Sequence, residues 1–173
     1  MIGILIPAHN EEALLDDCLR AARIAANHPG LLGEAVQILV VLDSCSDASA
    51  AIAQAHQVHC LHVQARNVGH ARGVGAGYLL EQGARWISCT DADSRVAPDW
   101  LVAQLAQGCD AVCGTVTVDA WSDGFDPAAQ IRYQQAYQAR DGHRHIHGAN
   151  LGVSARAYVE AGGFEPLECH EDV

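Results

Sequence analysis

Trp86-Ile87-Ser88-Cys89-Thr90-Asp91-Ala92-Asp93-Ser94 combines an apolar strand pattern with an acidic turn directly after it. A short apolar run bounded by polar residues is typical of a strand buried on both faces of a parallel sheet. Two carboxylates one residue apart at such a turn can approach one hard cation, which can also bind diphosphate oxygens. The stretch therefore predicts a buried strand that ends at a metal site. A turn of solvated acids at the start of a helix is the alternative interpretation.

Strand-like and helical patterns alternate on both sides of this stretch. Further strands are expected at 2–6, 36–42, 58–63 and 111–118, with helices at about 11–26, 48–57, 69–82 and 98–107. This alternation predicts βαβ units with right-handed crossovers, and therefore an α/β fold with a mostly parallel sheet. Beyond residue 118 the pattern loosens, and we expect a helix at 128–140, a strand at 149–153 and a short helix at 154–161.

Three polar turns follow strands one, two and four of this pattern: His9-Asn10-Glu11, Asp43 to Asp47 and Asp91 to Ser94. In open parallel sheets, ligands bind beyond the carboxyl ends of the strands. The three turns should therefore converge on one edge of the sheet and form a ligand site there.

Composition narrows the class of protein. A length of 173 residues suggests one domain, and a hydrophobic fraction of 50% argues against disorder. The net charge of −11 disfavours a nucleic-acid partner. Seven cysteines, an odd number without a close Cys-x-x-Cys pair, favour a reducing cytoplasm over a disulfide framework. No apolar run approaches the roughly 18 residues of a transmembrane segment, so we expect a cytoplasmic protein, with peripheral contact at the inner membrane face still open.

The order of the polar motifs resembles that of family 2 glycosyltransferases with the GT-A fold. The matching stretches are Ile6 to Glu12, Val40 to Asp47, Asn67 to Arg72, Thr90 to Ser94, Gly148 to Gly152 and the closing Glu171-Asp172. The resemblance covers essentially the whole chain. It implies a single GT-A domain over 1–173, with a Rossmann-like three-layer fold and a mostly parallel central sheet.

The resemblance also implies a reaction. A sugar would move from a nucleotide-diphosphate donor, expected to be a UDP-sugar, to an acceptor hydroxyl with inversion at the anomeric carbon. The nucleotide-sugar would be bound by Pro7, Ala8, His9, Asn10, Glu11, Asp43, Arg72, Asp91, Ala92 and Asp93. Asp93 and Asp91 would hold Mn²⁺ or Mg²⁺, while Asp172, beside Glu171, would be the general base. The acceptor could be a saccharide, a lipid-linked group or a small molecule.

Two positions depart from the family pattern, since Ser44 stands where many relatives have a second acid and His9 where many have Tyr. Both departures weaken the case for uridine. The chain also ends one residue after Asp172, whereas family members usually continue. We therefore expect a domain truncated at its C-terminal end.

Other interpretations remain open at this point. A nucleotidyltransferase would usually carry a glycine-rich turn after the first strand, and Pro7 to Glu12 contains no glycine. A catalytically incomplete nucleotide-binding module is the third candidate. His143, His145 and His147 alternate and could form a zinc site, but no Cys or acid with ligand spacing accompanies them. A polar loop beside the active site is the preferred interpretation of these histidines.

Overall fold

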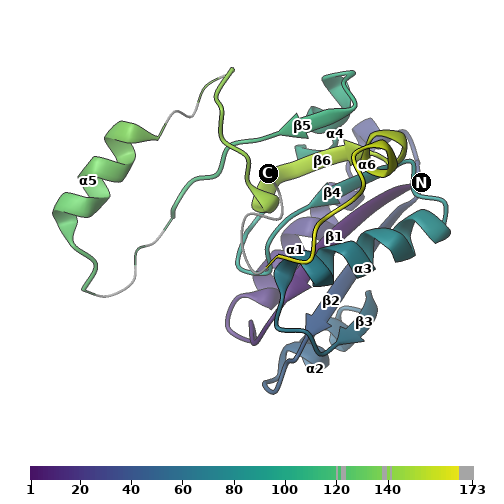
Figure 1. Cartoon of the computed structure of the whole chain (residues 1–173), viewed down its shortest axis with the longest axis horizontal. Coiled ribbons are helices and arrows are strands. Elements are labelled where there is room, and N and C mark those ends of the chain that lie inside the picture. Colours follow the sequence, from purple (N-terminus) through teal and green to yellow (C-terminus); the bar gives the residue numbers. More distant parts are fainter. Residues whose placement is uncertain (120, 122–123, 138–139, 141, 168–173) are drawn as a thin grey trace.

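Figure 1 shows the computed structural model, which describes residues 1–119, 121, 124–137, 140 and 142–167. Its centre is a six-stranded sheet with the order β3-β2-β1-β4-β6-β5. The strands are β1 (Ile2–Ala8), β2 (Val36–Asp43), β3 (His59–Val63), β4 (Trp86–Cys89), β5 (Ala111–Cys113) and β6 (Leu151–Ser154). Strands β1 to β4 pair in parallel, while β6 runs antiparallel to both of its neighbours. The sheet is therefore mostly parallel, as predicted.

Helices connect and cover these strands. They are α1 (Leu15–Ala26), α2 (Ser49–Ala55), α3 (Val68–Glu81), α4 (Trp100–Ala106), α5 (Pro127–Ala136) and α6 (Ala155–Glu160), with 3₁₀ turns at Pro29–Leu31 and Gly148–Asn150. Side chains alternate across β1, so that Ile2, Ile4 and Ile6 pack in one core cluster with α1 and α4. Leu5 joins a second cluster with α3 on the opposite face, where Figure 1 shows α3 lying across the sheet. The result is the expected three-layer α/β arrangement.

Helix α3 approaches the sheet closely because Gly75 has no side chain. A Cβ on Gly75 would overlap Leu5 and would lie 2.8 Å from Cγ2 of Val41. The same is not true along the whole helix, since a Cβ on Gly77 would meet nothing within 4 Å. Close packing on the strands therefore explains Gly75 among the glycines of this helix, but it does not explain Gly77.

The second half of the chain differs from the expectation. The strand predicted at 111–118 ends at Cys113, and the one predicted at 149–153 is a 3₁₀ turn followed by β6. Strand β6 is inserted between β4 and β5, so the chain must leave the sheet after β5 and return. The described residues between 114 and 147, which we call the arm, make this excursion. Figure 1 shows its helix α5 standing away from the sheet.

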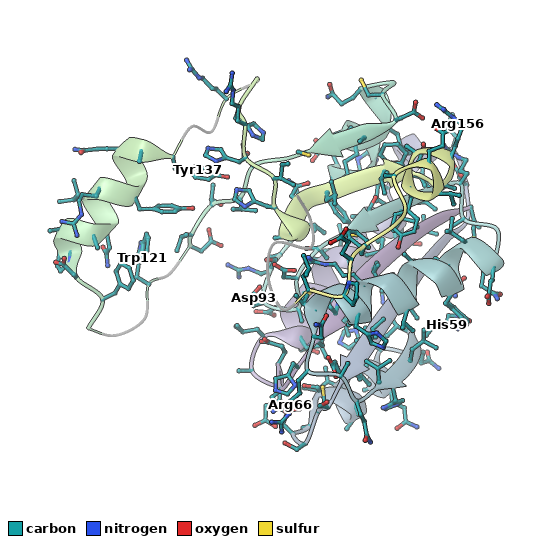
Figure 2. The ribbon with its side chains drawn as sticks, in the orientation of Figure 1. His59, Arg66, Asp93, Trp121, Tyr137 and Arg156 are labelled. Carbon is teal, nitrogen blue, oxygen red and sulfur yellow. The ribbon has the colours of Figure 1, made fainter. Side chains whose placement is uncertain are left out.

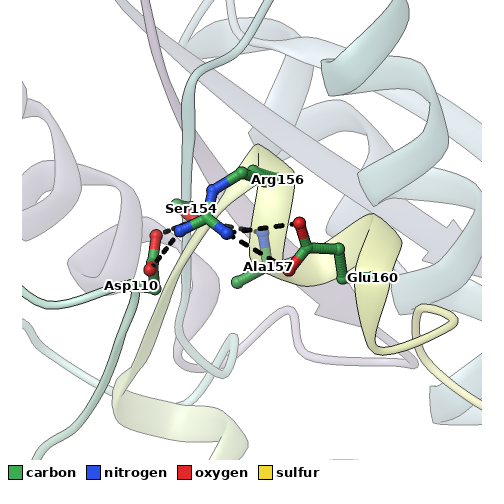
Figure 3. A network of polar contacts seen from close by, with 5 residues as sticks. All are labelled: Asp110, Ser154, Arg156, Ala157 and Glu160. Atoms are coloured by element: carbon green, nitrogen blue, oxygen red, sulfur yellow. Dashed lines mark hydrogen bonds and ion pairs between the residues drawn. The ribbon is translucent and has the colours of Figure 1, made fainter.

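A polar network on the surface ties β5 to β6 and α6 (Figure 3). Oγ of Ser154 donates to Oδ1 of Asp110 at 2.8 Å and accepts the backbone N–H of Ala157 at 3.1 Å, which caps α6. Arg156 joins Asp110 to Glu160 through two ion pairs. Because these side chains are exposed, the network adds little stability on its own. It does fix where the short edge strand β5 begins.

Candidate active site

An open cleft of about 1640 Å³ lies at the carboxyl edge of the parallel strands. The predicted turns after β1, β2 and β4 converge there, as expected for this topology. All the predicted nucleotide-binding residues except Asn10 line the cleft, namely Pro7, Ala8, His9, Glu11, Asp43, Arg72, Asp91, Ala92 and Asp93. Figure 2 shows Asp93 at the edge of the body that faces the arm.

Asp43 lines the cleft and is itself almost fully buried, with 4% of its surface exposed. Its Oδ1 accepts the backbone N–H groups of Ala65 at 2.8 Å and Arg66 at 2.9 Å, and its Oδ2 accepts that of Asn67 at 2.8 Å. The hydroxyl of Ser44 donates to the same carboxylate at 2.9 Å. Burial raises the pKa of Asp43, but these hydrogen bonds outweigh it and lower the pKa to about 2. The carboxylate is therefore ionised and holds the loop 65–67.

Asn10 lies outside the cleft because its side chain joins two turns together. Its Oδ1 accepts the backbone N–H of Ser46 at 2.8 Å, and its own backbone has a φ of 57°. Asn10 does not cap α1, because the capping position is Leu14, which makes no side-chain cap hydrogen bond. His9 links the same turns, with Nδ1 2.6 Å from the backbone oxygen of Asp43. These contacts set the position of the turn after β1 relative to β2.

Arg72 and Asp91 form an ion pair in the wall of the cleft. Arg72 comes from α3 and is 3% exposed, whereas the side chain of Asp91 is 40% exposed. The ion pair joins the helix on one face of the sheet to the acidic turn after β4. A buried guanidinium needs such a partner, because leaving a buried charge uncompensated is strongly unfavourable.

Cys18 of α1 also contacts the acidic turn, from the face of the sheet opposite to α3. Its thiol donates to the backbone oxygen of Asp91 at 3.3 Å. Burial, followed by the charges of Asp93, Asp91 and Glu11, raises the pKa of Cys18 to about 12, so the thiol stays protonated and can donate. Glu11 faces the same turn. Its pKa is raised by burial and then by the negative charges of Asp93, Asp47 and Asp91.

The donor set at this turn fits a divalent cation that is shared with a phosphate ligand. Asp93 is exposed to the cleft and Asp91 is partly exposed, and Mg²⁺ is commonly held by one or two carboxylates together with substrate phosphates. Within the described ranges, no group of three or more His, Cys, Asp or Glu side chains is arranged to hold a metal ion by itself. A divalent cation at this turn would therefore need further oxygen ligands besides these two carboxylates.

Several lining residues were not predicted as site residues. Arg66, Asn67, Arg95, His147 and Asn150 all border the cleft. Asn67 could have been recognised in the sequence as an N-cap residue, since Asn is preferred directly before a helix. Its side chain does accept the N–H of His70 at 2.7 Å and caps α3. Arg66 had no such signal in the sequence. Its φ of 50° is unusual for a residue with a side chain and follows from the contacts to Asp43.

The histidines of the arm stack with aromatic rings. The ring of His145 lies 4.4 Å from that of Tyr137 with an interplanar angle of 10°, and 5.6 Å from that of His147. His147 borders the cleft, and the hydroxyl of Tyr137 accepts the N–H of Val116 at 2.8 Å. Among the described residues, these histidines do not belong to a group of three or more side chains that could hold a metal ion. Their position agrees with the interpretation of a polar loop beside the site.

Trp121 packs inside the arm as well. Its ring centroid lies 4.7 Å from that of Phe125 and 5.5 Å from that of Tyr133. These contacts favour a role as a loop anchor over a role as a platform for a sugar. The two residues predicted to carry the base chemistry, Glu171 and Asp172, lie outside the described residues.

Comparison with known proteins identifies the family. A model described as glycosyl transferase family 2 matches residues 3–158. The chain belongs to glycosyltransferase family 2. The family and the GT-A fold are thus those that the sequence motifs predicted.

Solved structures of GT-A glycosyltransferases share this fold at low sequence identity. The S. aureus TarS 1-349 structure superposes with a TM-score of 0.71 at 14% identity, covering 99% of this chain and 52% of that one. Mannosyltransferase PcManGT from Pyrobaculum calidifontis, in complex with GDP-Man and Mn²⁺, gives 0.70 at 15% identity and coverage of 99% and 49%. Glucosyl-3-phosphoglycerate synthase from Mycobacterium tuberculosis, in complex with Mn²⁺, UDP-Glc and phosphoglyceric acid, gives 0.66 at 15% identity and coverage of 99% and 62%. The chain therefore spans about half to three fifths of the length of these proteins.

Among the helices that the structure describes, none combines the length and the apolar character that crossing a bilayer requires.

Proposed function

We propose that this family 2 chain transfers a sugar from a nucleoside-diphosphate donor to an acceptor hydroxyl, with inversion and with a divalent metal. The observation that carries the proposal is the convergence of Asp43, Arg72, Asp91 and Asp93 in one cleft at the carboxyl edge of the sheet.

Two parts of the cleft lining suit the two ends of such a donor. At one end, Asp43 holds the backbone of 65–67 and so shapes the surface that would receive the base and ribose. At the other end, Asp91 and Asp93 would hold Mn²⁺ or Mg²⁺ together with diphosphate oxygens. A bound cation supplies Lewis-acid stabilisation of the charge that develops on the leaving diphosphate. Burial is the largest cause of the raised pKa of Glu11, but the charges of Asp93, Asp47 and Asp91 raise it further, and a cation at the turn would relieve that charge repulsion.

The acceptor half of the reaction needs a base. A sugar hydroxyl is a poor nucleophile, and its proton must leave as the oxygen attacks the anomeric carbon. We assign this role to Asp172, with Glu171 beside it. Attack from the side opposite the leaving diphosphate gives inversion, with an oxocarbenium-like transition state as in glycoside hydrolysis.

The similar structures support a nucleotide-sugar donor and Mn²⁺ without selecting the sugar. One is a complex with GDP-Man and Mn²⁺, another holds UDP-Glc with Mn²⁺, and TarS was also solved with UDP-GlcNAc. We favour UDP because it is the donor nucleotide that the overall family resemblance implies. GDP is the second nucleotide to test.

The binding half is tested by titrating the protein with UDP and with GDP, each with and without Mn²⁺. We expect binding that depends on Mn²⁺, and we expect Asp93→Ala to weaken it by about 10- to 100-fold, as is usual for loss of a metal ligand or its support. Asp99→Ala is the matched control, because Asp99 is exposed and makes no side-chain cap hydrogen bond at the start of α4. Equal binding without Mn²⁺, or with Asp93→Ala, would contradict the metal assignment.

The chemical half is tested by screening nucleotide-sugars for release of UDP or GDP. Asp172→Asn should abolish turnover while leaving nucleotide binding intact. Turnover that survives this substitution would remove Asp172 as the base. Nucleotide binding by the unaltered protein, with no turnover of any donor, would instead favour a catalytically incomplete binding module.

A further inference from the structure

Gly148 lies directly against the guanidinium of Arg72. A Cβ on Gly148 would overlap the terminal nitrogens and the central carbon of that guanidinium. Both residues are buried, and Arg72 is 3% exposed. The space that a side chain would need at position 148 is therefore already filled by the group that pairs with Asp91.

The turn that carries Gly148 cannot easily move away from Arg72. Two residues further on, Oδ1 of Asn150 accepts N–H groups from Trp100 at 2.8 Å and from Gln104 at 3.3 Å. Its Nδ2 donates to the backbone oxygen of Thr115 at 2.9 Å, and its backbone oxygen accepts the N–H of Gly114 at 2.8 Å. The Gly148–Asn150 turn is thus anchored to α4 and to the segment after β5.

The topology explains why this turn reaches the acidic turn at all. Strand β6 is antiparallel to β4, with Leu151 beside Cys89 and Ser154 beside Trp86. The start of β6, rather than its end, therefore lies at the carboxyl edge of the parallel strands. The residues just before β6 arrive next to Asp91, which follows β4.

We propose that Gly148 is a positioning residue for the Arg72–Asp91 pair. An added methyl group at 148 displaces the guanidinium, because the flexible end of Arg72 gives way more readily than the anchored turn. Asp91 then loses the contact that orients its carboxylate at the metal turn. The inference rests on the proposed function, since it gives the pair a task in binding the nucleotide diphosphate and Mn²⁺.

The test is a double-mutant cycle on nucleotide binding. UDP and GDP are titrated in the presence of Mn²⁺ into the unaltered protein, Gly148→Ala, Arg72→Ala and the double variant. Gly77→Ala is the matched control, because it places the same methyl group in α3 with nothing within 4 Å. We expect about tenfold weaker binding for each single variant, the size expected when one charge-assisted hydrogen bond is lost. The double variant should bind no more weakly than Arg72→Ala, because both changes remove the same contact.

Melting temperatures of the same proteins, measured without nucleotide, test the contact independently. Gly148→Ala should lower the melting temperature. Adding it to Arg72→Ala should lower the melting temperature no further, because the guanidinium that the new methyl group would overlap is then absent. Independent, additive effects in either cycle would overturn the proposal, as would Gly148→Ala behaving like Gly77→Ala in binding. If the unaltered protein bound neither nucleotide, the proposed function and the positioning role would both fail, while the melting cycle would still report whether the contact exists.

Discussion

The carboxylate of Asp43 accepts the backbone N–H of Asn67 at 2.8 Å, and this bond joins the end of β2 to the residue that caps α3. The same carboxylate holds Arg66 at a φ of 50°. A single buried acid thus determines the shape of one end of the cleft. Its hydrogen bonds are made with the ionised form, so they contribute to folding only while the group stays charged.

Replacing Asp43 by Asn should lower the free energy of unfolding by about 2 kcal/mol at pH 7. The pKa of Asp43 is lowered from 3.8 to about 2, and each unit corresponds to about 1.4 kcal/mol. This stabilisation is present above the unfolded value of 3.8 and is lost as the pH falls through about 2. Denaturant unfolding between pH 2 and 7 measures it, with Asp99→Asn as the control. An unaltered pH dependence in Asp43→Asn would refute the role given to this carboxylate.

Replacing Glu11 by Gln should stabilise the protein at pH 7 and change little at pH 4. The pKa of Glu11 is raised above 4.5 by burial and by Asp93, so the folded state favours the protonated form. That preference contributes stability below pH 4.5, and the contribution is lost as the pH rises through the folded pKa. Gln mimics the protonated form at every pH. Thermal unfolding at the two pH values tests this prediction, and the exposed Glu81→Gln serves as the control. A Glu11→Gln variant that is less stable than the unaltered protein at pH 7 would contradict it.

Gly75→Ala and Gly77→Ala should have opposite effects on stability. At position 75 the new methyl group meets Leu5 and Val41, and overpacking of this kind typically costs about 1–3 kcal/mol. At position 77 the methyl group meets open space, and replacing a helix-interior glycine by alanine gains about 0.5–1 kcal/mol. Chemical denaturation of the two variants measures the difference. The same sign for both would show that α3 does not press on the sheet as described.

Gln104→Leu should destabilise the protein by about 1–3 kcal/mol, the usual cost of unsatisfied buried polar groups. Oε1 of Gln104 accepts from Ser88 at 2.7 Å and from Trp86 at 3.2 Å, and its Nε2 donates to Asn150 at 3.3 Å. Gln107→Leu, at the exposed position that follows the end of α4, should change stability by less than about 0.5 kcal/mol. Denaturant unfolding of both compares them directly. Equal small effects would mean that this network does not anchor the turn at Asn150.

The sequence by itself predicted the parts of this protein that depend on short-range pattern. The apolar runs of β1, β2 and β4 are long enough to identify buried strands, and their alternation with helices determines a parallel arrangement. Parallel strands bring their carboxyl ends to one edge, so the meeting of the turns at His9, Asp43 and Asp91 followed from the same pattern. The acidic turn could therefore be placed in a cleft without coordinates.

Only the tertiary structure decided how the other half of the site is built. Three features leave no periodic signal in the sequence. They are the insertion of β6 between β4 and β5, the position of Asn10 outside the cleft, and the contact of Arg72 with Gly148. Each depends on pairing between residues far apart along the chain. Because β6 is antiparallel to β4, its beginning and not its end lies at the ligand edge. Which side chains meet there depends on how the elements pack in space, and not on their neighbours in sequence.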